Sequence, residues 1–159
     1  YGEQNYVNWK VQQNNIKLLL VGPNEERNSI HEVTKKVIDE DVNIIKAGLV
    51  DKDIEYYYAL MSLLVLPTHR EGLGTSLLEA SAMSIPNLTT GHTGSRDAVV
   101  DGVTGFYIDM TVESIIQKIN IYLEKPKLLD LHGSNGREFI QKNFSQLVVW
   151  DEIEKLYLN

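Results

Sequence analysis

The chain has 159 residues, a formal net charge of −7 and no cysteine. This length suits one domain with its own core, and the missing cysteines exclude disulfides and thiolate metal sites. The acidic balance, with no basic patch interleaved with aromatics, argues against nucleic acid as a partner. No apolar stretch approaches the roughly 20 residues that a membrane span needs, so we expect a soluble domain.

Short apolar runs bounded by glycine or proline alternate with longer segments of helical periodicity. In chain order we predict a helix at Tyr6–Gln13, a strand at Ile16–Val21, a helix at Ser29–Glu40, a strand at Asn43–Ala47, a helix at Asp53–Met61, a strand ending at Pro67, a helix at Thr75–Met83, a strand at Asn87–Thr90, a helical turn at Arg96–Val99, a strand at Gly105–Ile108, and helices at Val112–Leu123, Lys127–Asn143 and Gln146–Leu158. The glycines in Gly133–Gly136 are expected to kink or split their helix. Trp9 and Trp150 are expected to pack rather than to recognise a ligand.

The runs Leu18–Val21 and Leu63–Leu66 do not alternate with polar residues. Such strands are buried on both faces, which predicts an α/β fold with a doubly wound, Rossmann-like parallel sheet. Ligands bind such sheets at the carboxyl ends of the strands. The loops at Gly22–Asn24, Gly48–Val50 and Gly91–Gly94, and the loop that contains Glu71, all leave carboxyl ends, so we expect them to converge on one cleft. Loops are short, which favours a single domain over residues 1–159.

Two acids frame a glycine-rich loop and the helix that follows it. Glu71 precedes Gly72 and Gly74, and Glu79 lies in the helix predicted to begin at Thr75. Glycines let the backbone approach a ligand closely, and the helix N-terminus presents free N–H groups and the positive end of the helix dipole. The arrangement predicts a phosphate-binding loop with two carboxylates nearby.

A longer ordered pattern surrounds these acids. It comprises Glu71–Gly74, Leu78–Ala80, Pro86, Thr89–Thr90, Gly94–Asp97 and Asp101–Gly105, within Tyr57–Ile108. The run resembles the nucleotide-sugar half of family 4 retaining glycosyltransferases, in the branch that builds bacterial capsular and exopolysaccharides. The chain departs from the family pattern at Ser62, at Met83–Ser84 and at Gly91–His92, and we assign His92 no role.

The resemblance implies a role for each acid. Glu71 would contact the transferred sugar and stabilise the positive charge at its anomeric carbon, which makes it the catalytic candidate. Glu79 would hold the ribose hydroxyls, which suits an ionised carboxylate facing a diol. The implied donor-binding residues are Glu79, Gly72, Leu73, Gly74, Thr75, Ser76, Gly22, Pro23, Leu49, Val50 and Gly94. Backbone N–H groups of Gly72–Ser76 would face the diphosphate, and uracil would rest against Gly48–Val50.

The resemblance further implies that the chain is the donor-binding half of a longer enzyme. That enzyme would move a sugar from a UDP-sugar to a hydroxyl of a lipid-linked saccharide. We expect the acceptor to be bound mainly by an amino-terminal domain. This chain is expected to lack both that domain and the strand that opens the donor half, so the fragment alone is expected to be inactive. The intact enzyme is expected in the cytoplasm, at the inner face of the plasma membrane, held there peripherally by the missing domain.

No metal or other cofactor is expected. Asp51-Lys52-Asp53 resembles the Asp-x-Asp metal motif of the other large glycosyltransferase fold, but Asp53 precedes a helical run and suits a helix N-cap. None of the four histidines has a second ligand at a helical or turn spacing.

Three alternatives remain open on sequence grounds. A nucleotide-sugar epimerase shares the layout but needs acids and a histidine for proton abstraction, for which only His92 is available. A glycosidase needs two carboxylates flanking one bond, which a helix-borne Glu79 would not provide. A non-catalytic nucleotide-binding module would bind UDP without needing Glu71.

Overall fold

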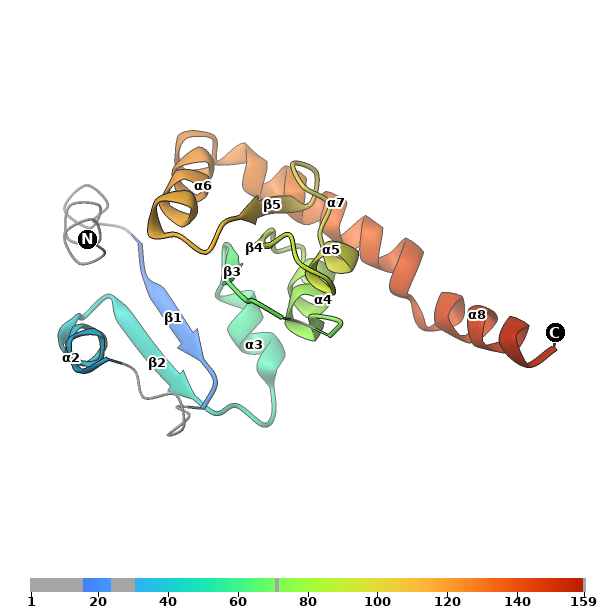
Figure 1. Cartoon of the computed structure of the whole chain (residues 1–159), viewed down its shortest axis with the longest axis horizontal. Coiled ribbons are helices and arrows are strands. Elements are labelled where there is room, and N and C mark those ends of the chain that lie inside the picture. Colours follow the sequence, from blue (N-terminus) through green and yellow to red (C-terminus); the bar gives the residue numbers. More distant parts are fainter. Residues whose placement is uncertain (1–15, 24–30, 71, 159) are drawn as a thin grey trace. The chain divides into compact units, whose positions relative to one another are not determined.

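The computed structural model describes residues 16–23, 31–70 and 72–158 (Figure 1). The chain divides into two compact units, the first ending at Tyr57 and the second beginning at Tyr58. The predicted helix at Tyr6–Gln13 lies outside the described residues, as does the start of the helix predicted from Ser29.

The first unit pairs two parallel strands, β1 (Leu18–Val21) and β2 (Ile44–Gly48), connected in sequence through α2 (Glu32–Glu40). Leu18 pairs with Ile44, and the register shifts between Leu20 and Val21, so that Val21 pairs with Gly48. An exposed ion pair between Lys46 and Asp39 ties β2 to α2; it contributes little to stability because water screens it. Helix α3 (Ile54–Ala59) follows and ends inside the second unit.

The second unit is built on three parallel strands in the order β3 (Leu64–Leu66), β4 (Asn87–Thr90) and β5 (Gly105–Ile108). Its helices are α4 (Thr75–Ala82), α5 (Ser95–Ala98), α6 (Val112–Glu124), α7 (Lys127–Phe144) and α8 (Gln146–Leu158). Every residue of the central strand β4 is buried. A strand buried along its whole length requires helices on both faces of the sheet.

Two apolar clusters account for those two faces. One contains Leu77 of α4 and Ala98 of α5, with Leu64 and Leu66 of β3 packed against it. The other contains Leu88, Ile108 and Tyr122 and takes up Leu63, Val65 and several residues of α6 and α7. Alternate residues of one apolar run thus enter opposite clusters, which explains why the run does not alternate with polar residues. The predicted α/β fold with parallel strands is confirmed.

Most predicted boundaries lie within a few residues of those in the structure. Asn87–Thr90, Gly105–Ile108 and Gln146–Leu158 have the predicted bounds, whereas the first strand begins at Leu18 and the helix after Asp53 ends at Ala59. Asp53 precedes α3 as expected, and its backbone carbonyl accepts a hydrogen bond from the Tyr56 N–H, 3.1 Å away.

Of the predicted kink or split at Gly133–Gly136, the split does not occur, because α7 is continuous from Lys127 to Phe144, close to the predicted helix at Lys127–Asn143. The glycines instead allow close packing against the end of α4 and the turn after it. A Cβ atom on Gly133 would lie 2.0 Å from the Ser84 carbonyl oxygen, and one on Gly136 would lie 3.4 Å from Ser81 Oγ. Their small size is needed for contact between elements rather than for a break.

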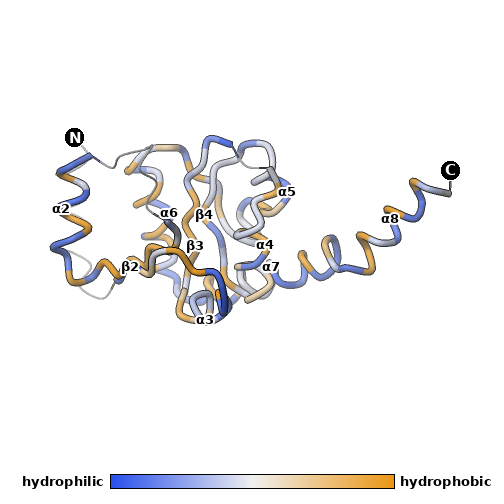
Figure 2. The backbone as a smooth tube through the Cα atoms, turned by 90° about the horizontal axis from the view of Figure 1, so that it is seen from below, coloured by the Kyte–Doolittle hydropathy of each residue, from blue (hydrophilic) through white to orange (hydrophobic). Residues whose placement is uncertain are grey.

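The expectation that Trp150 packs is also wrong for the described part of the chain, because 59% of this residue is exposed. Trp150 lies on α8, along which hydrophobic and hydrophilic residues alternate in Figure 2. Trp9 lies outside the described residues. None of the described helices combines the length and hydropathy needed to cross a bilayer.

Candidate functional site

The N-terminus of α4 has the geometry of an anion site. Gly74, the residue before α4, is buried and has φ 60°, a left-handed conformation that favours glycine. Its carbonyl accepts hydrogen bonds from the N–H groups of Leu77 and Leu78, at 2.8 and 3.2 Å. The hydrogen bonds among described residues use neither the Thr75 nor the Ser76 N–H, and Gly74 has no side chain to cap them. These amides and the helix dipole favour a negatively charged group.

The loop before α4 is open to solvent. Gly72 and Leu73 are exposed, and a Cβ on Gly72 would meet no atom within 4 Å. The predicted catalytic residue, Glu71, lies outside the described residues. Its role stays a prediction.

Glu79 is exposed on α4, yet its carboxylate accepts a hydrogen bond from the buried Tyr58 side chain. The Tyr58 hydroxyl lies 2.8 Å from Glu79 Oε2 and 3.4 Å from the Ser76 carbonyl oxygen. Tyr58 is only 5% exposed. Burial, followed by the hydrogen bond to Glu79, raises the pKa of Tyr58 above its ordinary value, so the phenol remains protonated and donates to the carboxylate.

In the first unit, a backbone hydrogen bond joins the two predicted loops that begin at Gly22 and Gly48. Gly22 has φ 134° and donates its N–H to the Gly48 carbonyl, 2.9 Å away, while Gly48 itself has φ 70°. Pro23 and Leu49 are exposed and Val50 is half-buried. The turns at the carboxyl ends of β1 and β2 therefore lie side by side. The expectation that they share one cleft with the Glu79 region stays a prediction.

A hollow of about 690 Å³, here called the carboxyl-end pocket, lies at the carboxyl ends of β3, β4 and β5. Its lining combines the last residues of β4 and β5, residues that follow each of the three strands, and three residues of α6: His69, Thr90, Gly91, His92, Arg96, Tyr107, Ile108, Asp109, Met110, Ser114, Gln117 and Lys118. Parallel sheets bind ligands at this edge.

The loop after β4 is held in place around this pocket. The Arg96 Nε donates to the Gly91 carbonyl, and the Tyr107 ring lies so close to Gly91 that an added Cβ would be 3.2 Å from it. The Tyr107 hydroxyl in turn donates to the Val99 carbonyl, 2.8 Å away. Gly94 is buried immediately before α5 with φ 88°, and its contact with a ligand stays a prediction. Its neighbours Gly91, His92 and Arg96 line the pocket.

The pocket is less acidic than the chain as a whole. Its lining residues include two basic side chains, Arg96 and Lys118, and one acidic side chain, Asp109. Lys118 Nζ lies 4.8 Å from the centroid of the Phe106 ring. Hydroxyl-bearing and anionic groups are the ligands that such a mixed lining can hold. Among residues 16–23, 31–70 and 72–158, the pocket included, no group of three or more His, Asp or Glu residues could hold a metal ion.

Comparison with known protein families assigns the chain to one of them. The profile described as "Glycosyl transferases group 1" matches residues 5–139. The chain belongs to the group 1 glycosyltransferases.

Among curated relatives of this glycosyltransferase chain is the capsular polysaccharide biosynthesis glycosyltransferase CapM of Staphylococcus aureus. It is 36% identical over 144 residues, covering 90% of this chain and 38% of CapM. The chain therefore spans about two fifths of that relative's length.

Two solved structures share the fold. Anabaena Alr3699/HepE, in complex with UDP and glucose, gives a TM-score of 0.82 at 18% identity, covering 96% of this chain and 43% of that one. The C-terminal domain of the group 1 family protein LpcC from Francisella tularensis gives 0.74 at 20% identity, covering 91% and 80%. The fold is thus that of the C-terminal, Rossmann-like domain of these GT-B glycosyltransferases.

The sequence analysis of this group 1 domain missed Tyr58. Tyr56, Tyr57 and Tyr58 are consecutive, and their composition alone does not say which one faces inward. Helical spacing offers a signal, because Ile54, Tyr57 and Tyr58 lie at positions i, i+3 and i+4 and are the less exposed residues of α3. The partner of Tyr58 on α4 leaves no such signal.

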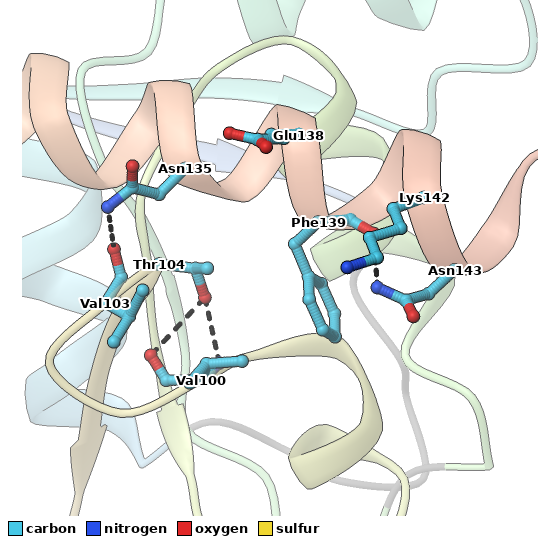
Figure 3. Close-up of a pocket in the computed structure, with 8 residues that line it drawn as sticks. All are labelled: Val100, Val103, Thr104, Asn135, Glu138, Phe139, Lys142 and Asn143. Atoms are coloured by element: carbon cyan, nitrogen blue, oxygen red, sulfur yellow. Dashed lines mark hydrogen bonds between the residues drawn. The ribbon is translucent and has the colours of Figure 1, made fainter.

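A second hollow, of about 450 Å³, contains none of the predicted site residues (Figure 3). It lies between the turn before β5 and the carboxyl-terminal half of α7. Asn135 Nδ2 donates to the Val103 carbonyl at 3.0 Å, and Thr104 Oγ1 accepts from the Val100 N–H at 2.9 Å (Figure 3). Because this hollow adjoins the amino end of β5, we do not assign the donor site to it.

Proposed function

We propose that this chain is the donor-binding half of a retaining glycosyltransferase that takes a UDP-sugar. The observation that carries the proposal is the pairing of an uncapped helix N-terminus at Gly74–Ser76 with an exposed carboxylate, Glu79, one turn along the same helix. A nucleoside diphosphate needs both features, since its phosphates are anionic and its ribose presents a vicinal diol.

In this proposal the α4 N-terminus holds the diphosphate and Glu79 accepts hydrogen bonds from the ribose hydroxyls. Leu49 and Val50 take the uracil through their backbone atoms. The UDP bound in the Alr3699/HepE structure supports uridine as the base. We propose no metal cofactor.

The carboxyl-end pocket is the proposed place of the transferred sugar. As the bond between the anomeric carbon and the β-phosphate oxygen breaks, positive charge develops on the sugar and Glu71 stabilises it. The acceptor oxygen then bonds to the anomeric carbon, and the departing phosphate accepts the acceptor's proton. The α4 amides stabilise the charge that the diphosphate gains, as preorganised dipoles do.

For the whole protein we propose the synthesis of a cell-surface polysaccharide on a lipid-linked saccharide at the cytoplasmic face of the membrane. The relationship to a capsular polysaccharide glycosyltransferase supports it. The acceptor would be held mainly by a second domain, as expected for a chain that spans 38% of CapM.

The test is a titration of the 159-residue chain with UDP, GDP and ADP by ligand-observed NMR. We expect saturable binding that prefers UDP and weakens about 10- to 100-fold in Glu79→Ala, since a hydrogen bond to a charged group is lost. Glu124→Ala, an exposed glutamate at the end of α6, is the matched control and should bind as the parent does. Equal affinity for the three nucleotides, or an unchanged affinity in Glu79→Ala, would contradict the proposal.

A further inference from the structure

Tyr58 places a buried hydroxyl directly beneath an exposed carboxylate. The ring of Tyr58 is in the last turn of α3 and is almost fully enclosed, while Glu79 is exposed to solvent. The hydroxyl donates to Glu79 Oε2 at 2.8 Å. It is also 3.4 Å from the Ser76 carbonyl oxygen, one helical turn earlier on α4.

This contact fixes a side chain that would otherwise move. An exposed glutamate samples many rotamers and loses that freedom when it binds a ligand, which weakens binding. A hydrogen bond from a rigid, buried ring removes part of the freedom before the ligand arrives. A carboxylate has about four acceptor positions, so one bond from Tyr58 leaves the others for a diol.

We propose that Tyr58 is a positioning residue, which holds the Glu79 carboxylate ready for the ribose diol of the donor nucleotide. The inference rests on the proposed function, since it assigns Tyr58 a role through the ribose contact of Glu79. Tyr58 itself does not touch the ligand. Because burial and the neighbouring carboxylate raise the pKa of Tyr58, it remains a donor at neutral pH.

A merely structural Tyr58 would fill the core and affect every ligand alike. The distinguishing experiment therefore compares UDP with 2′,3′-dideoxyuridine diphosphate, which lacks the diol, for the parent chain and for Tyr58→Phe. Phenylalanine keeps the buried ring and removes only the hydroxyl. We expect Tyr58→Phe to weaken UDP binding about 5- to 10-fold and to leave binding of the dideoxy nucleotide within about twofold.

Two further variants make the result specific. In a Glu79→Ala background, Tyr58→Phe should cause no additional loss of UDP affinity, because the group that it positions is gone. Tyr122→Phe is the matched control: Tyr122 is 2% exposed, and its hydroxyl hydrogen-bonds to His132 Nδ1 at 2.9 Å rather than to α4. Tyr122→Phe should lower thermal stability by about as much as Tyr58→Phe does and leave UDP affinity unchanged.

An equal loss for both nucleotides, or no loss for either, overturns the positioning role. If the parent prefers UDP over its dideoxy analogue and Glu79→Ala removes that preference, the proposed function stands even when Tyr58→Phe has no effect. If the parent binds both nucleotides equally, or neither, the ribose assignment of Glu79 fails, and this inference fails with it.

Discussion

At the scale of single residues, the burial of His132 gives the chain a pH response. His132 is 3% exposed on α7, packed edge-on against the rings of Phe106 and Tyr122. Burial lowers the pKa of His132 below its ordinary value, because the charged imidazolium would lose its hydration. The neutral form therefore dominates in the folded chain.

We predict that this chain loses stability as the pH falls below the ordinary histidine pKa of about 6.5. Between that value and the lower pKa of the folded state, the unfolded chain binds the proton more readily than the folded chain does. The free energy of unfolding therefore falls as the pH decreases through this range, and it keeps its full value above about 6.5. One such group contributes at most about 1.4 kcal/mol per pH unit. Urea unfolding from pH 7.5 to 5 would measure it.

The comparison chain for that experiment is His132→Phe, which removes the titrating group and should flatten the decline. Identical slopes for the parent and the variant would show that His132 does not control the response.

Gly74 offers a second test at the residue scale. Gly74→Ala should lower the free energy of unfolding by about 1–2 kcal/mol, since an L-residue at φ 60° is strained and its Cβ would lie 3.0 Å from Leu77 Cδ1. Gly72→Ala, two residues earlier in the same loop, has open space and no left-handed φ, so it should be nearly neutral. Urea unfolding at neutral pH compares the two; similar effects would contradict the conformational explanation.

At the scale of elements, the approach of α7 to the turn after α4 is set by small side chains. Gly133 faces the Ser84 backbone and Gly136 faces Ser81. Ser81 is itself buried and accepts a hydrogen bond from Asn87 Nδ2 at 2.7 Å, which links α4 to β4. A shift of α7 would therefore disturb a polar contact inside the second unit.

Gly133→Ala should destabilise the chain by roughly 3 kcal/mol or more, because its Cβ would lie 2.0 Å from a backbone oxygen that cannot move alone. Ser134→Ala, the next residue and exposed, should be neutral or slightly stabilising. Thermal melting followed by circular dichroism distinguishes them. A Gly133→Ala chain as stable as the parent would mean that α7 is not held at this distance.

At the scale of the whole molecule, binding and turnover should separate. We predict that the 159-residue chain binds UDP but releases none from UDP-glucose, because it spans 38% of the length of CapM and we propose that a second domain holds the acceptor. A coupled assay for released UDP, with and without oligosaccharide acceptors, measures this. Turnover above the protein-free blank would overturn the assignment of this chain to half of the enzyme.

Much of this organisation could be predicted from residue patterns. The apolar run at Leu63–Leu66 predicted a strand buried on both faces, and the two clusters that it enters confirm this. The predicted split at Gly133–Gly136 was wrong because glycine has two uses, freeing the backbone and admitting a neighbour. Only the position of Ser84 distinguishes them.

The sequence by itself determined the order of the elements and the family, and it identified the acid–glycine motif before α4, because these depend on local periodicity and on motifs of fixed spacing. The tertiary structure alone decided that Tyr58 anchors Glu79, 21 positions away, and that Gly91, His92 and Arg96 line a pocket while Gly94 is buried. Such contacts depend on how helices pack on the sheet. Packing is set by the summed shapes of many side chains, which no local pattern records.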